Sequence, residues 1–186
     1  MVSKTGAVDV NILSFLNRLS SIDSLRDKII VGILFETGCS INELCAIKAS
    51  DYIPPKDHDQ LDRIRFNDRK SVISPTLSSG IKKYMIFRKR SGSDYLFSQN
   101  PKNPMSAKRI EQLVIMLYDG KIRPMQIRYM HIINAASKGL SVDSICEQTG
   151  LSRQRVLQIL DASSVKYMQS YSVFFEEYGG KNERNV

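Results

Sequence analysis

The sequence predicts a single, mainly α-helical domain with a small antiparallel β element near its middle. Most of the 186 residues lie in segments whose apolar side chains recur every three or four positions, the period of an amphipathic helix. Only residues 61–74 alternate apolar and polar side chains in the manner of paired strands. Hydrophobic residues make up 42% and charged residues 25% of the chain, which is typical of a globular domain.

Three helices are expected in the first third of the chain. The first spans about residues 9–19 and the second about residues 24–35, with the Thr-Gly pair at 37–38 marking its end. Ser40 and Glu43 have the spacing of a capping box, in which a hydroxyl and a carboxylate satisfy free backbone amides. A short third helix therefore begins at Ser40.

The middle of the chain predicts a hairpin followed by a helix. Residues 51–59 form a turn region, and residues 61–66 and 71–74 are the two strands, with residues 67–70 at the hairpin tip. The following helix spans about residues 75–90.

The last part of the chain predicts a loop and five helices. The loop covers residues 95–104, and Ser106 caps the helix that follows it. The remaining helices are expected at residues 125–138, 141–148, 152–160 and 164–178, with a disordered tail at 179–186, so that residues 1–178 form one domain.

Positive charge is concentrated in the second part of the chain. The net charge is +8 and the isoelectric point about 9.4. Residues 1–60 contain 6 basic and 8 acidic side chains, whereas residues 61–186 contain 21 basic and 11 acidic ones. Because many of these cations lie beside polar residues in turn-like segments, we expect a nucleic-acid partner, with a merely solvated basic face as the alternative.

Other partners and cofactors have little support. The longest apolar run, residues 29–35, is far shorter than the roughly 20 residues of a bilayer span, and no secretion signal is visible, so a cytoplasmic protein without a membrane partner is expected. No metal or other cofactor is expected, because the cysteines and histidines lack the spacing of a metal site. Packing or surface roles are expected for Cys39, Cys45, Cys146, His58 and His131.

A helix-turn-helix unit is predicted at residues 140–160. Gly150 permits the sharp turn and Leu151 fills it. Arg153 and Arg155 open the second helix, where they are placed to face phosphates or base edges. A plain helical corner without DNA contact is the alternative.

Several segments, taken together, resemble the catalytic domain of the tyrosine recombinases, or phage integrases, over nearly the whole chain. Residues 34–51 contain Thr-Gly-Cys-Ser-Ile-Asn-Glu-Leu, similar to the family's TGxRxxEL block. The basic hairpin at residues 69–70 and the segment 95–106 add to the likeness. Residues 124–129 correspond to HxLRH and residues 160–171 to LGHSSIxTTxxY.

The resemblance implies a DNA-cleaving site that needs no metal. In the family a tyrosine attacks a phosphodiester, two arginines and a His or Trp stabilise the transferring phosphoryl group, and a hairpin lysine protonates the leaving oxygen. The matching positions in this chain that keep a suitable residue are Arg128, Lys70 and Tyr171.

Other matching positions have lost the family's residue. Ser40 replaces the first arginine, Met125 and Tyr129 replace the two histidines around Arg128, and Ala162 replaces the later His or Trp. In a second, gap-free register residues 149–151 match LGH, which puts Leu160 at the nucleophile's position. Since loss of one preorganised donor costs on the order of 3–4 kcal/mol, both registers predict impaired or absent strand cleavage.

The sequence therefore predicts a protein that binds double-stranded DNA on a recombinase-like fold. One alternative is a divergent active recombinase using Tyr171, with Lys121 or Arg123 replacing the lost arginine; others are a helix-turn-helix transcriptional regulator and a protein-interaction scaffold. Residues 174–178 are a candidate segment for homo-oligomer formation. The expected DNA contacts are Arg69, Lys82, Lys83, Arg88, Lys89, Arg90, Lys108, Arg109, Arg153 and Arg155.

Overall fold

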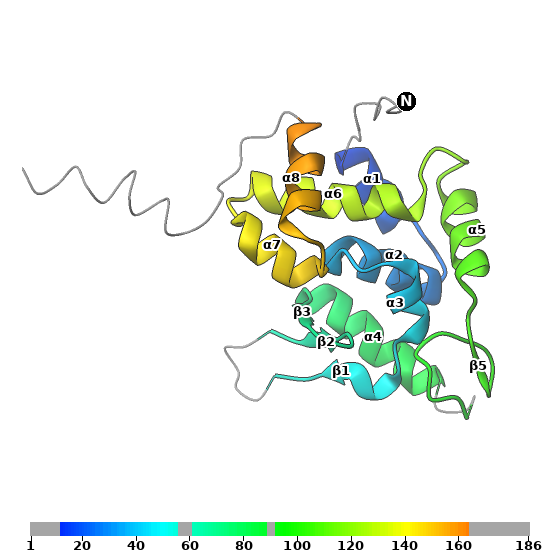
Figure 1. Cartoon of the computed structure of the whole chain (residues 1–186). Coiled ribbons are helices and arrows are strands. Elements are labelled where there is room, and N and C mark those ends of the chain that lie inside the picture. The colour runs from blue at the N-terminus through cyan, green and yellow to red at the C-terminus, as the bar shows by residue number, and fades with distance from the viewer. Residues whose placement is uncertain (1–11, 56–60, 89–91, 164–186) are drawn as a thin grey trace, which may run out of the picture.

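The computed structural model describes residues 12–55, 61–88 and 92–163, which form eight α-helices, one 3-10 turn and five short strands (Figure 1). The helices are α1 (Ile12–Ser20), α2 (Leu25–Thr37), α3 (Ile41–Ala46), α4 (Pro75–Arg88), α5 (Ala107–Leu117), α6 (Pro124–Ser137), α7 (Val142–Thr149) and α8 (Arg153–Asp161). The strands are β1 (Tyr52–Ile53), β2 (Arg63–Arg65), β3 (Lys70–Val72), β4 (Ser98–Asn100) and β5 (Asn103–Pro104), and the 3-10 turn is η1 (Ala49–Asp51).

The strands form two small antiparallel sheets. The larger has the order β1-β2-β3, with Tyr52 opposite Ile64 and Arg65 opposite Lys70. Strands β4 and β5 pair separately. The expected hairpin is thus present, but Lys70 belongs to a strand rather than to the hairpin tip. The turn region and the loop that the sequence predicted contain β1 and the β4–β5 pair, which are too short to show alternation.

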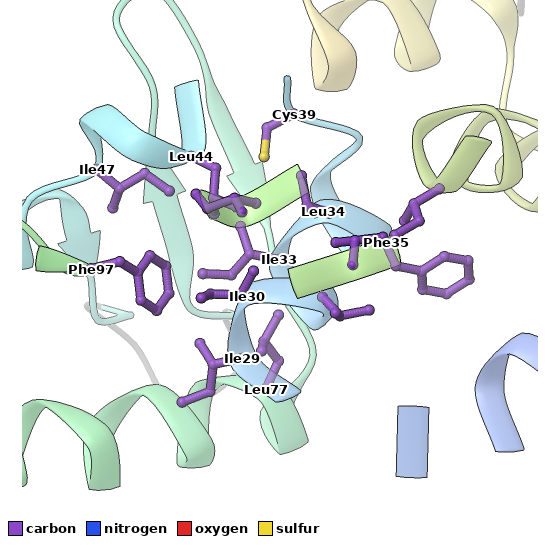
Figure 2. Close-up of a cluster of buried hydrophobic side chains, with 14 of the residues drawn as sticks. Ile29, Ile30, Ile33, Leu34, Phe35, Cys39, Leu44, Ile47, Leu77 and Phe97 are labelled. Atoms are coloured by element: carbon purple, nitrogen blue, oxygen red, sulfur yellow. The ribbon is translucent and has the colours of Figure 1, made fainter. Parts of the chain in front are cut away.

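Helix α2 is the centre of the fold (Figure 1). It packs against α1, α3, α4, α5 and α6, and its side chains are buried on nearly every side. In Figure 2, Ile30 and Ile33 extend from it toward Phe97 and Leu44, whereas Ile29 lies beside Leu77 of α4. A helix that is apolar all round has to be covered on all sides, which explains the ring of helices around it.

Helix α6 joins this main core to a second, smaller one. Ile127 and Met130 lie in the main core, whereas Ile132 packs with side chains of α7 and α8. Val156 and Leu160 of α8 are fully buried in the second core. The α7–α8 unit is therefore attached to the rest of the domain by its own apolar contacts with α6.

The mainly α-helical fold with a small antiparallel β element is confirmed. The helix expected at residues 164–178 and the tail at 179–186 lie outside the described residues. Among the helices that are described, none is long and apolar enough to cross a membrane.

Candidate nucleic-acid interface

The turn between α2 and α3, which we call the first corner, consists of Thr37, Gly38, Cys39 and Ser40. Gly38 caps α2 in the left-handed conformation (φ 59°, ψ 24°), which glycine adopts without strain. The Thr37 hydroxyl donates to a carbonyl one turn earlier (2.7 Å) and accepts from the Cys39 amide (3.3 Å). Ser40 accepts from the Glu43 amide (3.2 Å), and the Glu43 carboxylate accepts from the Ser40 amide (2.7 Å). The expected capping box is present.

The turn between α7 and α8, the second corner, repeats this construction with Thr149, Gly150, Leu151 and Ser152. Gly150 is left-handed (φ 67°, ψ 17°) and caps α7. The Thr149 hydroxyl again donates to a carbonyl one turn earlier (2.7 Å) and accepts from the Leu151 amide (3.4 Å). Ser152 caps α8 by accepting from the Arg155 amide (3.3 Å). Helices α7 and α8 therefore meet in a tight, capped turn at this corner.

The two corners pack directly on one another. A Cβ atom on Gly38 would lie 2.8 Å from the Thr149 methyl group and 2.6 Å from the ring of His131 on α6. Such contacts are shorter than van der Waals packing permits, so the close approach of the two corners requires a glycine here.

His131 is the buried residue that fills the space between the corners. Its Nδ1 lies 2.8 Å from the Phe35 carbonyl oxygen, which can only accept, so Nδ1 carries the proton. Burial, helped by the nearby positive charges of Arg128 and Arg69, lowers the pKa of His131 to about 4 against the opposing effects of hydrogen bonds to Phe35 and Gln148. The packing role expected for His131 fits this neutral ring.

Beside the first corner, a pocket of about 240 Å³ opens between α3, α5 and α6. Helices α5 and α6 both present their first residues to it, so the positive ends of two helix dipoles meet there. Burial raises the pKa of the Cys39 thiol in its wall to about 12, which keeps that thiol neutral. The polar and helix-terminal residues of the lining are Ser40, Asn42, Ala107, Pro124, Met125 and Arg128.

Arg128 is the charged side chain in the lining of this pocket. Its Nη2 donates to the Thr149 carbonyl oxygen at the end of α7 (2.6 Å). Its Nε is buried and has no hydrogen-bond partner among the described residues. Burial lowers the pKa of Arg128, while the negative charge of Glu43 opposes that shift. Arg128 thus links the pocket to the second corner.

Arg69 lies behind the first corner with a side chain only 7% exposed. It forms an ion pair with Glu43 (2.9 Å), and its guanidinium stacks over the Phe66 ring (4.2 Å to the centroid). A Cβ atom on Gly150 would lie 3.1 Å from its Nε, so Arg69 also packs against the second corner. The sequence analysis predicts Arg69 as one of the DNA contacts, but the side chain is buried.

Lys70 is exposed but is not directed toward Arg128. Its neighbour Ser71 is buried and donates from its hydroxyl to the Gln148 carbonyl oxygen of α7 (3.0 Å). Successive side chains of a strand point to opposite faces, so Lys70 extends from the face of the hairpin that lies away from α7. Within the described residues Lys70 does not line the pocket that contains Arg128, and Tyr171 lies outside the described residues.

The other predicted DNA contacts fall into two groups. Lys83, Lys108 and Arg109 are exposed and form no ion pair within the described part of the chain. Four others are engaged internally. Lys82 lies 3.5 Å from Asp62, Arg88 donates to the Ser93 carbonyl, Arg153 pairs with Asp143, and Arg155 donates to the Tyr129 hydroxyl (2.6 Å). Lys89 and Arg90 lie outside the described residues.

Comparison with known proteins finds relatives that are similar in sequence and fold. The XerA tyrosine recombinase of Pyrococcus horikoshii is 30% identical over 159 residues, which is 81% of this chain and 55% of that protein. The crystal structure of a XerA recombinase superimposes with a TM-score of 0.67 at 22% identity, covering 91% of this chain and 63% of the other. A XerH recombinase bound to a palindromic difH substrate gives a TM-score of 0.68 at 16% identity, covering 89% and 50%.

The chain has the fold of a tyrosine recombinase catalytic domain. The fold implied by the resemblance is therefore confirmed, although no family model matches the sequence. This recombinase-like chain spans about half the length of the curated relatives that it matches.

The backbone differs between the two places that the LGH motif can occupy. Gly150 ends a helix in the left-handed conformation, and the N-cap of α8, Ser152, follows two residues later. At the other place, Asp161 is the last residue of α8 and Ala162 is right-handed (φ −70°). The glycine of the LGH motif suits the left-handed conformation at Gly150, because glycine adopts the left-handed region freely.

Proposed function

We propose that this chain binds duplex DNA through phosphate contacts and that strand cleavage is impaired or absent in it. The proposal is supported by the net charge of +8, by the recombinase fold, and by the likeness to XerH, whose structure was solved on a DNA substrate. Lysines are suited to such binding, since each is a compact point charge that contacts a phosphate without reading a base.

The pocket at the first corner is the proposed contact for a backbone phosphate. Two helix N-termini and the Arg128 guanidinium give it a positive potential, and Lys108 is the next residue after pocket-lining Ala107. The unpartnered Nε of Arg128 would gain an acceptor from a phosphate oxygen.

The single observation that carries impaired cleavage is the residue content of this pocket. It contains Ser40 and Met125 where the family's resemblance implies an arginine and a histidine, and Arg128 is its one arginine. In the register favoured by the left-handed Gly150, the nucleophile's position is Leu160, which is fully buried in the second core. A fully buried leucine cannot attack a phosphodiester.

Binding is tested by fluorescence anisotropy of a labelled duplex over a range of salt concentrations. A protein that contacts several phosphates is expected to lose roughly a thousandfold in affinity between about 50 and 200 mM salt. Lys108→Ala should weaken binding and reduce the salt slope by about one. Lys138→Ala is the matched control, because this lysine follows the opposite end of α6, roughly 20 Å from the pocket. Salt-independent binding would instead favour a protein-interaction role.

Cleavage is tested separately with a nicked suicide duplex, which traps a covalent phosphotyrosine adduct. We expect no adduct. An adduct that disappears in Tyr171→Phe would establish the divergent recombinase instead, a candidate favoured by the 30% identity to the XerA tyrosine recombinase. The transcriptional-regulator alternative has less support, because Arg153 and Arg155 at the start of α8 are both engaged by side chains of the same chain.

A further inference from the structure

We propose that Arg69 provides, from the β2–β3 hairpin, the second guanidinium that position 40 no longer carries, and so forms with Arg128 a two-arginine site for a phosphate oxyanion. This inference rests on the proposed phosphate binding and assigns it a residue that the family's motifs do not. Three observations support it: the contacts of Glu43, the burial of the two guanidinium groups, and the packing that holds Arg69 in place.

Glu43 connects Arg69 to the pocket. One carboxylate oxygen of Glu43 accepts from the backbone amide and the hydroxyl of Ser40 (2.7 and 2.8 Å), which lines the pocket. The other oxygen lies 2.9 Å from Arg69 Nη2. In the TGxRxxEL block the arginine and the glutamate are three positions apart; here position 40 is Ser40, the N-cap of α3, and the guanidinium next to Glu43 comes from the hairpin.

The two guanidinium groups are left with unused hydrogen-bonding capacity. All three nitrogens of Arg69 are buried without a well-aligned hydrogen bond among the described residues, despite the short contact to Glu43. Arg128 Nε is in the same condition. Because His131 is neutral, the cluster carries two positive charges against the single carboxylate of Glu43. An oxyanion would balance this charge and give the buried donors acceptors.

Arg69 is also held in place before any ligand arrives. Its guanidinium stacks on Phe66 and its side chain packs on Gly150. Ser71, two residues further along the hairpin, forms a hydrogen bond with α7. The orientation of Arg69 is thus fixed before an anion binds, although its three nitrogens are covered and the Glu43 carboxylate has to move aside for an anion to reach them. Arg65, in the same hairpin, differs in each respect, since its side chain is 50% exposed and its ion pair with Asp51 (3.1 Å) lies at the surface.

The test uses inorganic phosphate as a probe of the whole chain, titrated at constant ionic strength against chloride. Phosphate should raise the melting temperature of the wild type. In Arg69→Met the phosphate-induced shift should disappear, with phosphate binding about ten- to a hundredfold weaker, the effect of losing one charged hydrogen-bond partner. Arg65→Met, the matched control, should keep the full shift.

Two further variants separate ligand binding from a purely structural role of Arg69. Arg69→Lys retains the charge but not the planar fork, so it should remain folded and show a reduced shift. Glu43→Gln removes the competing carboxylate and should increase the phosphate-induced shift, although it lowers the melting temperature without ligand. If Arg69 only clamps the hairpin, both variants are destabilised and the phosphate-induced shift stays at the wild-type value, which overturns the proposal.

Duplex binding shows whether the anion is a DNA phosphodiester or a free phosphate. It also separates failure of the Arg69 inference from failure of the proposed DNA binding. An Arg69-dependent salt slope, reduced by about one in Arg69→Met, assigns the site to a DNA phosphodiester. Dependence on Arg69 with inorganic phosphate alone assigns it to a free phosphate. Salt-dependent binding of the wild type that is unaltered by Arg69→Met in both assays rejects this inference while retaining the proposed function; absence of any salt-dependent duplex binding rejects the proposed function itself.

Discussion

The two corners of this molecule share one backbone design but differ in what their side chains do. In each, a threonine hydroxyl, a left-handed glycine and a serine N-cap turn one helix into the next with nearly the same hydrogen bonds. The first corner lies inside the main core and turns Glu43 toward Arg69. The second lies nearer the surface and directs Arg153 and Arg155 into contacts with Asp143 and Tyr129.

The comparison shows that the residues that cap the helices at each corner are not the residues at the positions where the resemblance implies catalytic side chains. The Thr, Gly and Ser of each corner satisfy backbone groups and remain in place. Ser40 and, in the gap-free register, Leu151 stand where the resemblance implies catalytic side chains, and neither replacement disturbs a cap. The caps of both corners therefore form without the side chains that the resemblance implies at these two positions.

The largest expected effect comes from adding a methyl group at each corner glycine. Gly38→Ala should lower the free energy of unfolding by about 2 to 5 kcal/mol, because a left-handed alanine costs about 1–2 and overpacking about 1–3. At Gly150 the nearest atom, Arg69 Nε, would lie 3.1 Å from the added methyl group, compared with 2.6 Å at Gly38, so Gly150→Ala should cost only about 1 to 2 kcal/mol. Urea unfolding of both variants measures the difference, and equal losses would show that the corners do not differ in packing.

The free energy of unfolding should depend on pH because His131 is buried against the first corner. Because burial depresses the pKa of His131 to about 4, the unfolded chain takes up the proton first as pH falls below the ordinary value of 6.5. The stabilising contribution of the neutral ring is complete above pH 6.5 and is lost as the pH falls toward about 4, a change of about 3 kcal/mol.

This contribution is isolated by comparing pH profiles of the unfolding free energy. His131→Leu should flatten the profile between pH 6.5 and about 4 by the stated amount, whatever its effect at neutral pH. His58→Gln is the control for the other histidine. A profile unchanged in His131→Leu would mean that this ring accepts a proton without disturbing the corner packing.

Local chemistry explains which features the sequence could predict. The serine caps and the two Thr-Gly breaks fix the ends of α2, α3, α7 and α8, because a cap involves residues only a few positions apart. Strands β1, β4 and β5 have two or three residues each and carry no periodic signal. Their existence depends on partners elsewhere in the chain, which a local pattern does not contain.

The candidate site was harder to predict for the same reason. Arg128 was found through its motif, but the burial of Arg69 depends on Glu43, Phe66 and Gly150, which come from three separate segments. One signal was available: Glu43 keeps its place in the TGxRxxEL resemblance although position 40 is a serine, which leaves a cation from another segment to pair with it. The direction of Lys70 depended on strand register, where a shift of one residue reverses the face.

The smallest expected difference concerns the two serine caps. Ser152→Ala should cost about 1 kcal/mol, since it removes one accepted hydrogen bond at an exposed helix start. Ser40→Ala should cost somewhat more, about 1.5 to 2 kcal/mol, because the Ser40 hydroxyl also donates to Glu43 (2.8 Å) and helps to orient the carboxylate that faces Arg69. Combining each with Arg69→Met gives the deciding measurement: the Ser40 and Arg69 losses should be non-additive, whereas the Ser152 and Arg69 losses should add within about 0.5 kcal/mol. Additivity in both pairs would mean that the capping box and the buried arginine act independently, and that the two corners differ only in exposure.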